Sequence, residues 1–282
     1  MERRKRSAER RDDVVEQIDW IMWAEEALKM PGGMNGTYSR FRTLSYMNQL
    51  RLAMQGVFEP VNTYKGWAEL DTPRQVMKGA KARAILRPIM VKNRLVEQED
   101  DDDRLLRFKL VRCMFPVSET EGPELPPWTP PEWSPEQALG ALGVREIPFE
   151  GFNANRQGYS VGKELAINPV ARYPAKTLMH ELMHIQLGHT ADDFEDYREH
   201  RGTCEGQAEL GAYLLMNELN ALDKMDPAES RGYIQTWLGD GELKDDAIRD
   251  VFKAVDSILK AGWVREDEPA EVEAQRKIRT GS

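Results

Sequence analysis

A proline-rich segment divides this chain and limits the structures available to it. Seven prolines lie between residues 116 and 135 of the 282 residues. Because proline lacks a backbone N–H group and fixes φ, this segment cannot be a helix or a central strand. We therefore expect a linker at residues 118–135, which separates an N-terminal domain of residues 1–117 from a C-terminal domain of residues 136–282.

The hydrophobic pattern differs between the two predicted domains. In the first, apolar residues recur at helical spacing over residues 8–29 and about 40–55, and strand-like runs follow at residues 63–70, 82–91 and 105–115. In the second, helices are expected at about residues 136–141, 174–187, 204–220, 228–238 and 244–261, with short strands at 147–149, 158–161 and 164–167. The chain is predicted to be an α+β protein, in which a small domain of helices and an antiparallel sheet precedes a mainly helical domain.

Charge is distributed unevenly along the chain. Residues 1–96 contain 18 Lys and Arg against 11 Asp and Glu, whereas the chain as a whole has a net charge of −9. A basic first third and an acidic remainder suggest that the two parts have different partners. There is no run of 18 apolar residues and no signal-peptide pattern, so we expect a cytoplasmic protein without a membrane partner.

The motif with the clearest chemistry is His180-Glu181-Leu182-Met183-His184. On a helix, residues four apart lie on one face, so His180 and His184 can bind one cation. The helix is expected because Pro174 suits its first turn and Gly188 can end it. The pattern H-E-x-x-H is typical of zinc sites in which the glutamate, here Glu181, acts on a water molecule.

A third ligand is expected from a pair of glutamates downstream. A catalytic Zn²⁺ has three protein ligands and one position for water. Glu205 and Glu209 are one helical turn apart, and we assign Glu205 as the third metal ligand, with His180 and His184. Glu209 is assigned as the acceptor of a hydrogen bond from a ligand histidine. The reverse assignment, with Glu209 as the ligand, stays open.

The other two histidines are expected to be structural. A third histidine ligand of the metzincin pattern stands six residues after the second, whereas His189 follows His184 by five and His200 does not fit either. A hydrolytic site also needs a donor for the oxyanion. Tyr213, His200 and Tyr159 are all candidates for that role.

These residues together predict metal-assisted hydrolysis. A bound Zn²⁺ lowers the pKa of its water from 15.7 toward about 7 and polarises the scissile carbonyl. Glu181 would take the proton of that water and pass it to the leaving amine. A structural metal that joins two helices without turnover is the alternative, because a sequence does not show an open coordination position.

The C-terminal motifs resemble a known family. The run from Lys176 to His184, with Leu187-Gly188-His189, resembles zincin-like metallopeptidases of the ImmA/IrrE type. Residues 205–209 through Ala212-Tyr213, followed by residues 233–240, resemble the C-terminal domain of ArdC antirestriction proteins. The chain departs from that family where Gly206 and Gln207 replace an apolar residue and a carboxylate. The resemblance implies a zincin-like metallopeptidase domain at residues 136–282.

The N-terminal half resembles the single-stranded-DNA-binding domain of the same family. The matching residues are Asn48-Gln49, Gly66-Trp67, residues 76–82, and residues 115–117 with 120–122. The resemblance covers about residues 40–260. It implies that the chain binds single-stranded DNA, protects incoming phage or mobile-element DNA from restriction, and carries a metal site of unproven substrate.

Cationic and aromatic residues in the N-terminal half are consistent with such binding. Single strands are held in basic grooves and by aromatic side chains on which bases stack. The candidates for DNA contact are Trp67, Lys78, Lys81, Arg83 and Arg87. Strand alternation would place Lys81, Arg83 and Arg87 on one face. An ordinary sheet with a polar outer face is the alternative.

The leading hypothesis is an ArdC-like antirestriction protein that binds single-stranded DNA and carries a zinc H-E-x-x-H site, with a protein or peptide as its substrate. The alternative is an ImmA/IrrE-type site-specific metalloprotease that acts on a regulatory protein. A non-enzymatic DNA mimic that uses the acidic run at residues 97–103 ranks last, because it leaves the histidine motif unexplained.

Overall fold

The computed structural model describes residues 18–30, 44–92, 104–125, 132–150, 156–190, 201–241 and 243–263. The predictions for residues 8–17, for the acidic run, for residues 126–131 of the proline-rich linker and for His200 lie outside these ranges. The chain forms two compact units. The first contains Val61–Pro123, and the second contains Asp19–Pro60 and the chain from Glu124 onward.

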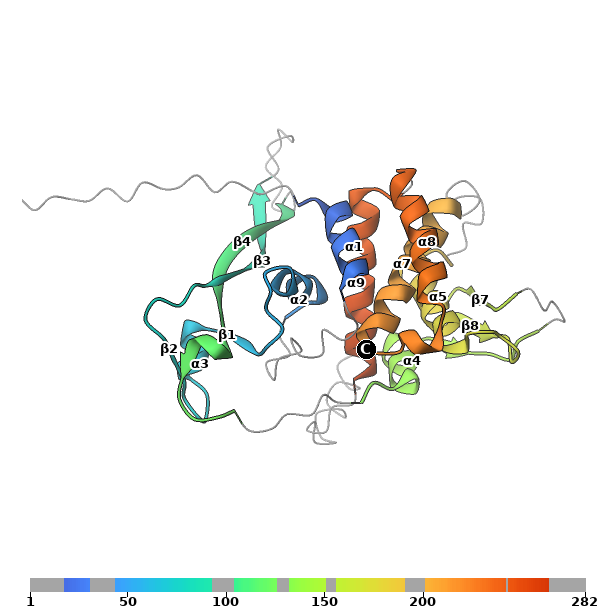
Figure 1. Cartoon of the computed structure of the whole chain (residues 1–282). Coiled ribbons are helices and arrows are strands. Elements are labelled where there is room, and N and C mark those ends of the chain that lie inside the picture. The colour runs from blue at the N-terminus through green and yellow to red at the C-terminus, as the bar shows by residue number, and fades with distance from the viewer. Residues whose placement is uncertain are drawn as a thin grey trace, which may run out of the picture. The chain divides into compact units, whose positions relative to one another are not determined.

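The first unit is built on a three-stranded antiparallel sheet (Figure 1). Its strand order is β1-β4-β3, with β1 at Val61–Thr63, β4 at Arg104–Pro116 and β3 at Arg83–Lys92. A smaller sheet pairs β2 (Gln75–Val76) with β5 (Thr120–Glu121), which follows the 3₁₀ helix η2 (Val117–Glu119). The strands predicted at residues 82–91 and 105–115 are confirmed as β3 and β4.

The strand predicted at residues 63–70 is wrong, because this segment forms the short helix α3 (Tyr64–Ala68). Thr63 Oγ1 accepts a hydrogen bond of 2.9 Å from the Gly66 N–H group and so caps the helix. The turn of the helix directs Trp67 inward, where its side chain is fully buried. The segment therefore forms a helix with a side-chain cap, although its composition is typical of a strand.

The second unit is mainly helical. Its helices are α1 (Trp20–Lys29), α2 (Tyr46–Ala53), α4 (Pro135–Leu142), α5 (Pro174–Gln186), α7 (Arg201–Glu218), α8 (Pro227–Gly239) and α9 (Asp245–Gly262), with a 3₁₀ helix η3 (Leu222–Lys224). A three-stranded sheet has the order β6-β8-β7, with β6 at Arg145–Glu146, β8 at Glu164–Ile167 and β7 at Gly158–Val161. The chain is an α+β protein, as its sequence predicts, although residues 147–149 form no strand. Within the described part of the chain, no helix is both long and apolar enough to cross a membrane.

Helix α7 forms the centre of the second unit and is in contact with α5, α8 and α9. All of its residues from Ala208 to Glu218 are buried. Gly211 permits a close approach to α5, since a Cβ atom at this position would collide with the Met183 side chain. This packing brings the N-terminal half of α7 next to the motif on α5.

Helices α1 and α2 pack on α9 in the second unit (Figure 1). The ring centroids of Trp20 and Tyr46 lie 6.1 and 6.0 Å from that of Phe252 on α9. Their apolar faces are thus buried against the apolar stripe of α9. This arrangement differs from the predicted domain of residues 1–117, because the two helices belong to the C-terminal unit.

Candidate metal centre

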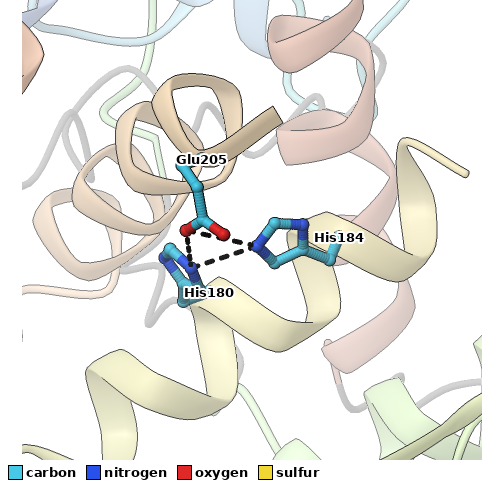
Figure 2. Close-up of side chains that lie close together, drawn as sticks. All are labelled: His180, His184 and Glu205. Carbon is cyan, nitrogen blue, oxygen red and sulfur yellow. Dashed lines mark hydrogen bonds and ion pairs between the residues drawn. The ribbon is translucent and has the colours of Figure 1, made fainter. Parts of the chain in front are cut away.

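Helix α5 presents the histidine motif to α7. Pro174 occupies its first turn, and Gly188, with a φ of +78°, follows its end. Met179, Leu182 and Met183 are buried on the apolar side of the helix. His180 and His184 point toward α7, and Figure 2 shows the carboxylate of Glu205 facing both rings.

Three donor atoms meet at this place. His180 Nε2 lies 3.1 Å from His184 Nε2 and 3.4 Å from Glu205 Oε2. The distance from His184 Nε2 to Glu205 Oε2 is 3.8 Å. Ligands about 2.0–2.1 Å from a tetrahedral Zn²⁺ lie about 3.3 Å from one another. The three residues that the sequence predicts as metal ligands are therefore close enough together to hold one metal ion.

The electrostatics of the site favour a cation. Burial of His180 disfavours its charged form, but Glu205 and Glu209 outweigh that cost and raise the pKa of His180 to about 9. A positive charge is thus stabilised between these carboxylates, as a proton or as a divalent ion.

Glu209 lies beside the other nitrogen of His180. Its Oε2 atom is 3.4 Å from His180 Nδ1 and 2.7 Å from Lys176 Nζ, and its Oε1 atom accepts a hydrogen bond of 2.5 Å from Ser230 Oγ. Burial alone would raise the pKa of Glu209, but His180, Lys176 and Ser230 lower it to about 2. Because Glu209 faces Nδ1 and not Nε2, this geometry favours Glu205 over Glu209 as the ligand.

His189 contacts His184 on the side away from the donor atoms. The Nδ1 atoms of the two rings are 3.0 Å apart, and His189 Nε2 lies 3.1 Å from Gln207 Oε1. Burial and the neighbouring His184 lower the pKa of His189 to about 4. His189 is thus no part of the donor triangle, which agrees with its predicted exclusion from the ligands.

Glu181, the predicted catalytic residue, lies outside the donor triangle. Its Oε2 atom accepts a hydrogen bond of 2.7 Å from Ser160 Oγ on β7. Gly158, at the start of β7, leaves room for this carboxylate, because a Cβ atom there would lie 3.2 Å from Glu181 Oε1 and 2.7 Å from the Thr177 methyl group. Ser160 could not be identified from the sequence as a neighbour of Glu181, since its only signal is its place in a predicted strand.

A cleft of about 1090 Å³ opens at the site. His180, Glu181, His184 and Glu205 all line it, together with Tyr159. The donor triangle and the Glu181 carboxylate are thus both reached from this cleft.

The oxyanion candidates differ in their access to this cleft. Tyr159 lines it, whereas Tyr213 is buried and its hydroxyl accepts a hydrogen bond of 3.3 Å from Arg231 Nη1. Tyr213 is therefore a structural residue, and Tyr159 stays a candidate.

The residues of the first unit that were predicted to contact DNA differ in their exposure. Trp67 was predicted wrongly as a stacking residue, because it is fully buried and its indole N–H donates a hydrogen bond of 2.9 Å to the Phe115 carbonyl. On the same helix Tyr64 is 59% exposed. Lys78 and Arg87 are exposed.

Arg83 and Lys81 do not continue one strand face with Arg87. Strand β3 begins at Arg83, and its register shifts between Arg83 and Ala84, so the predicted alternation breaks there. Arg83 pairs with Glu119 at 2.7 Å, while the side chain of Lys81 is exposed. Of the four cations predicted to contact DNA, Lys78, Lys81 and Arg87 are exposed.

No family model matches the chain, and no curated protein is similar to it. Two solved structures are similar, and both are crystal structures of the antirestriction ArdC protein from the R388 plasmid. The metal-free one has 20% identity and a TM-score of 0.49 and covers 87% of this chain and 96% of its own. The Mn(II)-bound one has 19% identity and the same TM-score and covers 87% of this chain and 98% of its own. These structural neighbours are from the family that the sequence motifs resemble.

Proposed function

We propose that this chain is an ArdC-like antirestriction protein with a zinc-dependent metallopeptidase-type site. The observation that carries the proposal is the triangle of donor atoms from His180, His184 and Glu205 in a cleft that is also lined by the Glu181 carboxylate, which lies outside the triangle. A structural zinc site uses four protein ligands, whereas these three leave one position for water. A catalytic metal fits this donor set better than a structural one.

Each residue of the site has its own role in the proposed hydrolysis. A divalent ion held by the three ligands supplies Lewis-acid polarisation of a carbonyl and a lowered pKa of water. Glu181 accepts the proton of the attacking water and returns it to the leaving amine. The Ser160 hydroxyl orients this carboxylate through Oε2. Glu209 holds the proton of His180 on Nδ1, so that the Nε2 lone pair is free for the ion.

The test of hydrolysis uses the full chain in zinc-loaded and chelator-treated forms. Each form is incubated with a library of unstructured peptides, and new N-termini are identified by mass spectrometry. The proposal expects cleavage by the loaded form alone. A loaded protein that cleaves no peptide and no protein would contradict it and would favour the structural metal.

We further propose that the first unit binds single-stranded DNA through Lys78, Lys81 and Arg87, with Tyr64 as the aromatic surface in place of Trp67. The four side chains are exposed, and a base can stack on a phenol ring. The cations would contact phosphates and release counterions.

We expect Tyr64→Ala to weaken binding of a single-stranded oligonucleotide by about five- to a hundredfold, since one stack contributes about 1–3 kcal/mol. The triple alanine variant of Lys78, Lys81 and Arg87 should reduce the slope of log affinity against log salt by about 2, at about 0.7 for each contact. Fluorescence anisotropy at several salt concentrations measures both effects.

Lys253→Ala is the control for the DNA experiment, because Lys253 is an exposed lysine of helix α9 in the second unit that pairs with Asp250 at 2.9 Å. It should leave the slope unchanged. Wild-type affinity that does not fall as salt rises would contradict DNA binding. Peptide cleavage by such a protein would favour the alternative function, a site-specific protease of a regulatory protein.

A further inference from the structure

A line of hydrogen-bonding groups runs behind His184, on the side of the ring that faces away from Glu205. It begins at His184 Nδ1, passes through the ring of His189 and the amide of Gln207, and ends at the backbone carbonyl of Ala247 on helix α9. The three steps measure 3.0, 3.1 and 3.0 Å. The hydrolytic chemistry described above makes no use of this line.

The carbonyl at the end of the line fixes the orientation of the Gln207 amide. A carbonyl oxygen can only accept a hydrogen bond, so the NH₂ group of Gln207 must be the group that faces Ala247. The amide oxygen then faces His189 Nε2, where it too can only accept. His189 must therefore carry a proton on Nε2.

The tautomer of His189 in turn fixes that of His184. A neutral imidazole with its proton on Nε2 has a lone pair on Nδ1, and this lone pair accepts a hydrogen bond from His184 Nδ1. His184 then carries its proton on Nδ1 and has its lone pair on Nε2. That Nε2 atom is the one that lies 3.8 Å from Glu205 Oε2 and 3.1 Å from His180 Nε2.

We propose that Gln207 and His189 are positioning residues, which hold His184 in the tautomer and ring orientation that a divalent ion requires. The inference rests on the proposed metal site and adds two residues that the site's chemistry does not otherwise assign. It also distinguishes the two ligand histidines. His180 is oriented by a carboxylate, Glu209, whereas His184 is oriented by a neutral relay that brings no further negative charge into the site.

The affinity of the full chain for Zn²⁺ tests the relay. Gln207→Leu removes the acceptor for His189 Nε2 and acts on the ligand His184 only through His189, so it should weaken zinc binding by up to about 10–100-fold, the usual effect of losing the partner of a ligand histidine. Gln207→Glu keeps the acceptor oxygen for His189 Nε2 but loses the N–H group that donates to the Ala247 carbonyl, so it should weaken zinc binding less than Gln207→Leu does. Competition with a chromophoric chelator measures the dissociation constants.

Ser257→Ala is a matched control for these variants. Ser257 on α9 donates a hydrogen bond of 3.4 Å to Gln186 Oε1 on α5 and reaches no ligand residue. Its removal should leave zinc affinity unchanged. Equal affinity of the wild type and Gln207→Leu would overturn the proposal.

The histidine tautomers give a second readout that needs no metal. Long-range ¹⁵N–¹H correlation spectra of the metal-free chain resolve its four histidines, and His189 should carry its proton on Nε2 and His184 on Nδ1. In Gln207→Leu both rings should become mixtures of tautomers. A His189 ring protonated on Nδ1 in the wild type would overturn the relay. A wild type that shows the expected tautomers but binds no zinc would contradict only the proposed function.

Discussion

The Glu205→Ala variant is expected to lose bound zinc. The wild type should retain about one equivalent after dialysis, because three donor atoms at 3.1, 3.4 and 3.8 Å from one another can share one ion. Removing one of the three ligands should lower the affinity for zinc by more than the loss of a supporting residue does, which is about 10–100-fold. His180→Ala should have the same effect. Metal content by inductively coupled plasma mass spectrometry measures both.

Two other glutamates of the same unit provide the comparison. Glu229 lines the cleft and pairs with Arg172 at 3.9 Å, and Glu229→Ala should keep the metal. Glu209→Ala should weaken zinc binding without abolishing it, because Glu209 acts through His180. Full metal content in Glu205→Ala together with none in Glu209→Ala would show that Glu209 is the ligand instead.

The donor triangle could be predicted from the sequence because its geometry is mostly local. The spacing of His180 and His184 places both rings on one helix face, whatever else the chain does. The prediction of Glu205 as the third ligand needed one further assumption, namely that the next helix packs against the helix of the two histidines. That assumption succeeded because a metal site needs a third ligand and because the acidic pair stands at helical spacing.

The features that the sequence did not predict depend on contacts between distant segments. The relay through His189 joins the end of α5 to Gln207 on α7 and to a carbonyl on α9, and nothing in the local pattern shows this meeting. The prediction that Trp67 contacts DNA was wrong for a related reason. Whether an aromatic ring is buried or exposed depends on which face of its element meets the core. Trp67 was expected on a strand, but the segment forms the helix α3, which is capped by Thr63.

The Glu181→Gln variant is expected to keep its metal and to lose hydrolysis. The amide is nearly the same size as the carboxylate and can still accept the hydrogen bond from Ser160, so the fold and the donor triangle should be unchanged. It cannot take a proton from water at neutral pH. General acid–base catalysis typically contributes about 10²–10⁴-fold, and we expect a rate loss in that range. Initial rates on a peptide identified from the library, with zinc content measured in parallel, give the comparison.

The Ser160→Ala variant separates orientation from proton transfer. It leaves the Glu181 carboxylate in place and removes only the hydrogen bond to Oε2, so its rate loss should be smaller than that of Glu181→Gln. Undiminished cleavage by Glu181→Gln would contradict the catalytic role of this carboxylate. A structural metal predicts a different pattern, in which neither variant changes any activity and chelation only lowers the melting temperature. An ion present at about 100 times its dissociation constant stabilises a fold by about 2.7 kcal/mol, which a melting experiment detects.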